Sequence, residues 1–361
     1  MRHVRVAGRR QLHFMTISRR TFGRLVLGAG AAAPFCFARR ALAAPKPGDE
    51  LVVGIWGGIQ ERLVREHCEK PLGKKFSCKV NFVLGGTPER RARAYAERGR
   101  PSFDVIYLNI FESRQAVKDG VTQAATPAVP QYSHLVDIAR LGGYGVAINP
   151  ITIIYDKRKA RVPVTSWKDL WNPEWKGRIA WPAFPAAEGA AGLLMTAKVW
   201  GGDERNIGVA FEKIKQLKPF AAISSSQDEL YQMFDTGVCD IAIEFGSLSR
   251  KYGETRNPNL VIAMPVEGQA AALNVACITV GTANQKLAEE WINLHLSEPC
   301  MLAYAREMYY SPTVDNVRIP ADLKPKLVSF AEAARLVDFD WSAVIHNQRA
   351  WTTRFNREIA G

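Results

Sequence analysis

The sequence predicts an α/β protein made of two domains, on three observations. A chain of 361 residues is longer than one average domain. Strand-like segments at 51–56, 79–84 and 103–108 alternate with helix-like segments, which is typical of a parallel α/β unit. Two more buried-type strands are expected at 240–246 and 260–265. The apolar fraction of 47% and the charged fraction of 23% are ordinary for a globular protein.

Glycines, prolines and capping residues delimit the expected helices. Gly57-Gly58 separates the first strand from the helix that follows it. Thr87-Pro88 begins a strongly basic helix, and we expect its arginines, including Arg90, to face solvent. Ser226 and Glu229 have the spacing of a capping box, which predicts a helix starting there with oriented N–H groups.

Residues 1–43 predict an export signal. Arg19-Arg20 precedes an apolar segment at 25–37 that is rich in Gly and Ala, and Ala41-Leu42-Ala43 supplies the small residues of a signal peptidase site. The apolar segment is shorter than the roughly 20 residues that a membrane span needs. We expect the twin-arginine translocase to export the chain to the periplasm, with cleavage near Ala43. A basic amphipathic or mitochondrial-type leader is the alternative.

The charge distribution argues against nucleic acid as a partner. The formal net charge is +13, but nine arginines and no acidic residue lie within residues 1–43. The remainder therefore carries only +4, spread over the rest of the chain. A surplus of this size is a solvated surface and not a stripe that binds phosphates.

The middle of the chain carries the most specific pattern. Residues 142–156 hold glycines followed by two β-branched runs, separated by Pro150, which predicts two short strands. The pattern W-x-x-L-x-x-P-x-x-x-G then covers residues 167–177. Together these features closely resemble the polyamine-type, family 1 extracellular solute-binding proteins, which are the soluble receptors of ABC importers.

The resemblance implies a fold with two lobes. This is the periplasmic binding protein type 2, or Venus flytrap, architecture, in which two interlobe crossings join two α/β lobes. The second crossing is expected at 273–280. The N-lobe would comprise residues 45–149 plus 277–330, and the C-lobe residues 150–276. Residues 331–361 would form a helical segment that packs on the lobes of a monomer.

The first candidate site residues follow from the strand order alone. In parallel α/β sheets, ligands collect beyond the carboxyl ends of the strands. Trp56, Gly57, Gly86, Asn109 and Phe111 all follow expected strands, so we expect them to line a ligand site. Glycines between a strand and a helix also let a ligand approach backbone N–H groups.

Further candidates rest on the resemblance. In the family, an aromatic residue after the first strand packs on the ligand, as Trp56 would here. An acidic pair at the start of a C-lobe helix binds an ammonium group; Glu188 matches its first member, whereas Ala191 stands at the second. Phe245 matches an aromatic after a C-lobe strand, and Asn274 stands where the family has an Asp. Two of the three expected carboxylates are therefore missing.

These differences shape the expected ligand. A buried ammonium without a carboxylate costs several kcal/mol, so the resemblance favours a solute with one cationic end. It could be polyamine-like, a monoamine or amino acid-like. Ser225, within a run of three serines, or Arg250 would donate hydrogen bonds to an acidic end. Lobe closure would capture this small molecule, and the partner that receives it would be an ABC permease in the cytoplasmic membrane.

Two alternatives belong to other functional classes. A ferric iron receptor on the same fold would use an adjacent tyrosine pair, and Tyr309-Tyr310 is such a pair, although it lies late in the chain. The six histidines show no metal-ligand spacing. A secreted enzyme using Glu188 and Glu244 is the other alternative, but the sequence lacks the G-x-S-x-G and H-E-x-x-H motifs. We therefore expect no catalytic residue, no metal and no cofactor.

The cysteines indicate neither a disulfide framework nor a zinc site. Five lie beyond residue 43, at scattered positions: Cys68, Cys78, Cys239, Cys277 and Cys300. We expect them to be small buried hydrophobic residues. Cys68 and Cys78 are close enough in sequence for one bridge, and the sequence leaves open whether it forms.

Overall fold

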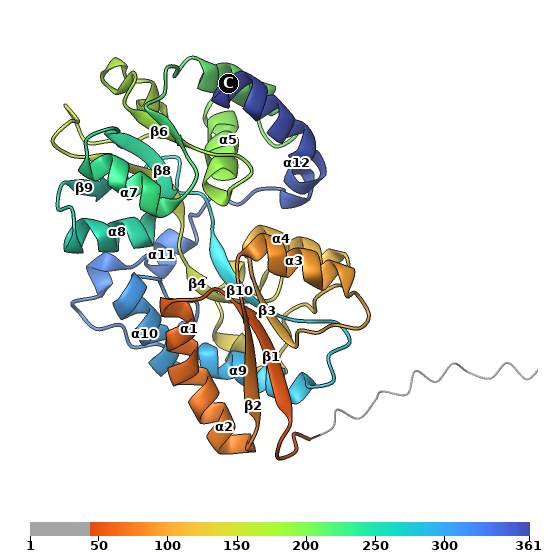
Figure 1. Cartoon of the computed structure of the whole chain (residues 1–361). Coiled ribbons are helices and arrows are strands. Elements are labelled where there is room, and N and C mark those ends of the chain that lie inside the picture. Colours follow the sequence, from red (N-terminus) through yellow and green to blue (C-terminus); the bar gives the residue numbers. More distant parts are fainter. Residues whose placement is uncertain (1–43) are drawn as a thin grey trace, which may run out of the picture. The chain divides into compact units, whose positions relative to one another are not determined.

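Two five-stranded mixed sheets organise residues 44–361, which are the part of the chain that our computed structural model describes (Figure 1). The predicted export signal at 1–43 lies outside these described residues. Among residues 44–361, no helix combines the length and the apolar character that a membrane span requires.

The first sheet contains the three strands predicted early in the chain. Its order is β2-β1-β3-β10-β4. The strands are β1 (Glu50–Ile55), β2 (Lys79–Leu84), β3 (Val105–Asn109), β4 (Tyr144–Ile148) and β10 (Leu273–Ile278). β1 is parallel to β2 and β3, whereas β10 is antiparallel to β3 and β4. The predicted parallel α/β unit is thus confirmed.

The second sheet has the order β7-β6-β8-β5-β9. Its strands are β5 (Ile151–Asp156), β6 (Ile179–Pro182), β7 (Ala222–Ser224), β8 (Ile241–Phe245) and β9 (Leu260–Ile262). β6 is parallel to β7 and β8, and β5 runs antiparallel to β8 and β9. We refer to the sheet of β1 and its helices as the N-lobe, and to the sheet of β6 and its helices as the C-lobe.

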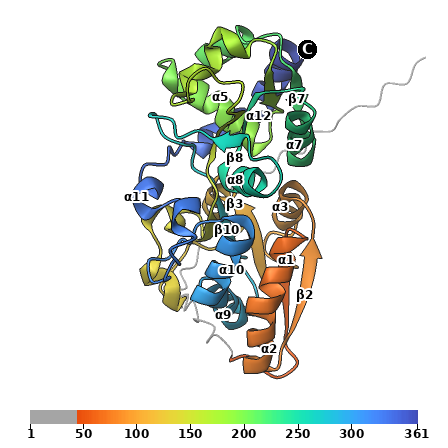
Figure 2. The ribbon, with the colours of Figure 1, turned by 90° about the vertical axis from the view of Figure 1, so that its left-hand side faces the viewer.

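Helices cover both sheets. The N-lobe helices are α1 (Ile59–Val64), α2 (Lys70–Phe76), α3 (Thr87–Ala96), α4 (Ile110–Lys118), α9 (Gln285–His295) and α10 (Glu298–Met308), with a π-helical turn at Arg65–Glu69. The C-lobe helices are α5 (Ala187–Val199), α6 (Gly208–Lys215), α7 (Gln227–Asp235), α8 (Gly246–Thr255) and α12 (Trp341–Phe355), which ends in a π-helical turn at Asn356–Ala360. Figure 2 shows α1 and α2 alongside α10 and α9, which they contact.

Short helical segments occupy the connections. α11 (Phe330–Ala333) follows a 3-10 turn at Lys324–Lys326. Further 3-10 turns lie at Pro130–His134, Asp137–Arg140, Trp167–Trp171 and Pro173–Trp175. The last two fall in the W-x-x-L-x-x-P pattern, where Ser166 and Asp169 form a capping box. The breakers in this pattern therefore allow only short turns there.

The chain passes between the two sheets at both predicted crossings and once more. β4 leads directly into β5 through Asn149 and Pro150. On the return, Ala270 pairs with Ile151 before β10 begins. A third passage brings Val337 beside Ala270 and carries the chain to α12. α12 therefore belongs to the C-lobe, where its apolar side chains join the core.

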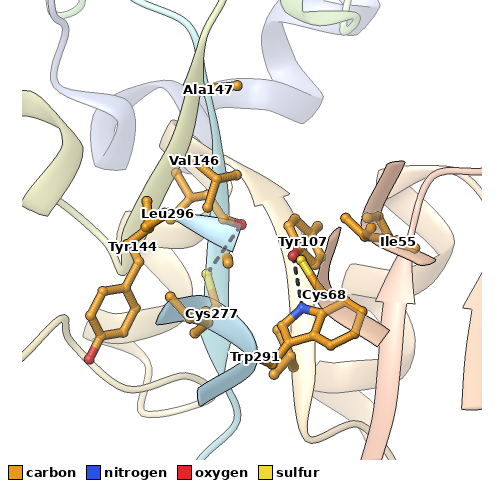
Figure 3. Close-up of a cluster of buried hydrophobic side chains, with 14 of the residues drawn as sticks. Ile55, Cys68, Tyr107, Tyr144, Val146, Ala147, Cys277, Trp291 and Leu296 are labelled. Carbon is orange, nitrogen blue, oxygen red and sulfur yellow. Dashed lines mark hydrogen bonds between the residues drawn. The ribbon is translucent and has the colours of Figure 1, made fainter. Parts of the chain in front are cut away.

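Large aromatic side chains fill the core of each lobe. In the N-lobe, Tyr107 and Trp291 are buried between the sheet and α9, and Trp291 Nε1 donates a hydrogen bond to Tyr107 Oη at 2.9 Å (Figure 3). In the C-lobe, Trp167, Trp175 and Trp181 are each at most 1% exposed. The alternation of strand and helix explains these cores, because a sheet covered by helices buries both of its faces.

The cysteines are mostly core residues, as expected. All five cysteines among the described residues are free, and four are buried. Cys68 does not lie against Cys78. Its Sγ is 3.9 Å from Sγ of Cys300, on α10, whereas Cys78 is half-buried at the start of β2. The nearness of Cys68 and Cys78 in sequence was therefore misleading, since α2 separates them.

Candidate ligand-binding site

A cavity of about 350 Å³ is lined by residues of both lobes. β1, β3 and β8 end at its wall, and α5 begins there. The local sequence explains this convergence, because glycines or capping residues stop each strand and let its next side chain face the space beyond the sheet. Six predicted site residues line this cavity: Trp56, Asn109, Phe111, Glu188, Phe245 and Asn274.

The other predicted site residues lie outside the cavity lining. Gly57 and Gly86 are exposed neighbours of the lining residues Trp56 and Thr87. Ser225 uses its hydroxyl locally, donating to Glu229 Oε2 at 2.7 Å near the start of α7. Arg250, the other expected donor for an acidic ligand group, instead donates to the carbonyl of Pro325 at 2.7 Å. Neither Ser225 nor Arg250 is among the lining residues.

Trp56 is held in place by two contacts from α3. Its Nε1 donates to Thr87 Oγ1 at 3.1 Å, and the Arg90 guanidinium lies 4.6 Å from the centre of its ring. The expectation that Arg90 faces solvent was wrong: it is 2% exposed and donates to the carbonyl of Tyr107 at 3.0 Å. Burial lowers the pKa of Arg90 to about 10, so it stays charged at neutral pH.

The site contains a carboxyl pair, Glu188 and Glu244. From the sequence, Glu188 was expected to contact the ligand, whereas Glu244 was named only as a possible catalytic acid. Glu188, at the start of α5, lines the cavity and is half-buried, and the Glu244 carboxyl lies within its hydrogen-bonding reach. Glu244 is only 4% exposed, behind the cavity wall. The position of Glu244 in the sequence could have indicated this, because a carboxylate near the end of a buried strand is rarely found without a partner or a function.

Burial and mutual repulsion disfavour the ionised forms of this carboxyl pair. Burial raises the pKa of both carboxyls, and the neighbouring Glu188 raises the pKa of Glu244 further. Glu244 Oε1 accepts from the backbone N–H of Phe245 at 2.8 Å and from Gln227 Nε2 at 3.3 Å. Because two like charges this close repel each other, ionisation of both carboxyls at once is disfavoured.

Side-chain amides and a phenol complete the polar wall. Asn274 Nδ2 donates to Gln60 Oε1 at 3.1 Å, and both residues line the cavity. Asn109 caps α4 together with Glu112. Tyr310 also lines the cavity, and burial raises the pKa of its hydroxyl. Such groups can orient a polar solute by hydrogen bonds.

The tyrosine pair considered for iron does not converge on one point. Tyr310 lines the cavity, whereas the hydroxyl of Tyr309 donates to Glu254 Oε2 at 2.5 Å and lies 3.0 Å from Lys326 Nζ. The left-handed backbone of Tyr309, with φ of 55°, ends α10 and separates the two side chains. The pair therefore offers only one phenol to the cavity.

Two α/β lobes around a cavity of this size define the class of two-lobed periplasmic binding proteins. Comparison with known proteins agrees with this fold. The model of the family described as "Bacterial extracellular solute-binding protein" matches residues 101–342, and the chain belongs to that family.

Individual relatives are more distant. The chain is similar to the thiamine-binding periplasmic protein of Salmonella typhimurium, with 25% identity over 209 residues, 57% of this chain and 61% of the relative. The match thus spans about three fifths of that relative's length. An ABC transporter structure from Clostridium perfringens aligns with TM-score 0.75 and 24% identity, over 86% of this chain and 99% of that one. A periplasmic thiamin binding protein aligns with TM-score 0.65 and 20% identity, over 88% and 100% of the two chains.

Proposed function

We propose that this protein is the periplasmic receptor of an ABC importer and that it captures a small organic cation between its lobes. The observation that carries this proposal is the Glu188–Glu244 carboxyl pair, of which Glu188 lines a cavity that Trp56, Phe111 and Phe245 also line. Carboxylates and aromatic faces are the two kinds of group that attract a cation in a partly dry site. The solute would be an amine or a ring cation.

The relatives support the same class of ligand. The Salmonella relative is named for thiamine, whose thiazolium ring carries one permanent positive charge. Polyamine-like, monoamine and amino acid-like solutes also present an ammonium group. One charge on the protein suits one charge on the ligand, because an uncompensated buried charge is costly.

Binding would act through the two lobes. A ligand shifts a conformational equilibrium only when it contacts one state better than the other. Trp56 and Asn109 belong to the N-lobe, and Glu188 and Phe245 to the C-lobe, so a solute among them favours the state that brings both sets together. That state would dock on a membrane permease after the signal at 1–43 has directed export and been cleaved.

The test is titration calorimetry on the mature chain with a panel of cations. The panel contains thiamine, spermidine, putrescine, ethylamine, 2-phenylethylamine and 4-aminobutyrate, with glutarate as an anionic counterpart. We expect saturable binding of at least one cation, without turnover, and at least tenfold weaker binding by Glu188→Gln. Glu66→Gln, at an exposed position that does not line the cavity, is the control. Binding that survives Glu188→Gln unchanged, or product formation, would contradict the proposal.

A further inference from the structure

A second cavity of about 480 Å³ adjoins the first. The two share part of their lining: Pro88, Phe111, Glu112, Pro185 and Ala186. Because these shared residues come from α3, α4 and the loop before α5, the two spaces meet at the same interlobe wall. A solute long enough to leave the first cavity past Phe111 would enter the second.

The second cavity differs in chemistry from the first. Beyond the shared residues, its wall is mainly apolar, with Phe184 before α5 and Trp341, Val344 and Ile345 on α12. Its charged groups are Arg91 and Glu112, and Glu112 also lines the first cavity. Because the charges of Arg91 and Arg90 already act on Glu112, this wall suits an uncharged, apolar group better than a second ammonium.

The aromatic part of this wall is held firmly. The rings of Phe111 and Trp341 have centroids 4.5 Å apart and an interplanar angle of 31°, so they pack on each other in a tilted arrangement. Trp341 Nε1 donates to Asp338 Oδ1 at 3.3 Å, and Asp338 is in turn paired with Arg114 Nη1 at 2.6 Å. α12 therefore presents a fixed surface, and a ligand that contacts it loses little free energy to ordering of the protein.

We propose that the solute has two parts, a cationic group held at Glu188 and a flat apolar group that lies in the second cavity, against the wall that Phe111 and α12 form. This inference rests on the proposed function and deepens it, because it names the class of solute as an organic cation with an aromatic or similarly apolar body. It also gives α12, which the sequence marks only as a C-terminal helix, a role in specificity. A linear polyamine does not meet this description, because its second ammonium would reach an apolar wall.

The test compares two ligands that share one head group. Ethylamine carries the ammonium alone, and 2-phenylethylamine adds a ring. Burial of a ring against aromatic walls is expected to raise the affinity at least tenfold. Ile345→Ser should remove most of this advantage and leave the affinity for ethylamine unchanged. Trp341→Ala should act in the same direction, but Trp341 is buried, so the half-buried Ile345 keeps the test valid if the Trp341 variant fails to fold.

The controls separate this inference from the proposed function. Arg349→Ala changes an exposed residue of the same helix that does not line the cavity, and it should alter neither affinity. Equal affinities of the two amines for the unmodified protein would overturn this inference and leave the proposed function standing. An advantage of the ring that survives Ile345→Ser and Trp341→Ala would also overturn it. If no cation binds, both proposals fail.

Discussion

Replacing Glu244 by Gln should change how the stability of the ligand-free protein depends on pH. Burial and the neighbouring Glu188 raise the pKa of Glu244 well above its ordinary value of 4.5. The folded protein therefore binds a proton that the unfolded chain has released, at every pH between these two pKa values. Stability is then greatest below 4.5 and falls as the pH rises through that window.

The change in the free energy of unfolding per pH unit does not depend on how far apart the two pKa values of Glu244 lie. One proton of difference between the folded and unfolded states changes the free energy of unfolding by about 1.4 kcal/mol per pH unit. Glu244 is 4% exposed, so solvent screening does not reduce this value much. A Gln side chain keeps the acceptor for Phe245 N–H and can donate its own N–H to Glu188, but it does not titrate. Glu244→Gln should therefore be more stable than the unmodified protein at pH 8, with a difference that shrinks toward pH 5.

Urea denaturation followed by tryptophan fluorescence at several pH values between 5 and 8 measures this difference directly. Other titrating groups contribute equally to both proteins and cancel in the comparison. Glu66→Gln, at an exposed position, should run parallel to the unmodified protein and serves as the control. If Glu244→Gln also ran parallel over this whole range, the shared proton in the carboxyl pair would be refuted.

Three further predictions concern stability and reactivity. Burial lowers the pKa of His295 from 6.5 to about 3, so the unfolded chain takes up a proton below pH 6.5 that the folded protein does not, and the free energy of unfolding falls by about 1.4 kcal/mol at pH 5.5. His295→Asn should reduce this loss of stability in urea denaturation; an unchanged loss would contradict the prediction. Iodoacetamide should modify only Cys78 in the native mature chain, because the other four cysteines are buried and should react only in urea. Mass spectrometry measures the labelling, and modification of those four in the native protein would contradict the prediction. Gly189→Ala would place a Cβ against the carbonyl of Ala183 and should lower the free energy of unfolding by about 1–3 kcal/mol. Gly208→Ala, whose Cβ would meet only ordinary contacts, is the control and should leave thermal unfolding nearly unchanged.

The strands could be predicted from the sequence because each is a short apolar run between breakers. β1, β3 and β8 lie within two residues of their expected positions. Once these are known, the rule that ligands collect at the carboxyl ends of strands selects Trp56, Asn109 and Phe111, which do line one cavity. Their contact with a ligand stays a prediction. The short edge strand β7 was missed, since three residues carry no periodicity.

What the sequence could not give is the pairing of side chains from distant segments. Arg90 reads as part of a solvated basic helix, yet Trp56 and the carbonyl of Tyr107 bury it. Glu244 was expected beside Glu188 only as a possible acid–base partner in an enzyme, and it is the approach of α5 that places the two carboxyls together. Such contacts join residues far apart in the chain, so neither spacing nor local propensity contains them.

These pairings decide which carboxyl in the cavity is available to a ligand. Glu112 also lines the first cavity, but the charges of Arg91 and Arg90 act on it and oppose the rise in pKa that burial causes. Its charge is therefore already compensated within the protein. Among residues 44–361, no basic side chain acts comparably on the pKa of Glu188 or Glu244.

Under the proposed function, this difference predicts the charge of the solute. A monocation would compensate one ionised carboxyl of the pair and leave the other protonated. A dication at the same point would have to expel that proton to be matched, so its affinity should rise with pH where that of a monocation changes less. If the two proposals hold, the buried pair would discriminate between cations by their charge, and the apolar wall of α12 would discriminate by their shape.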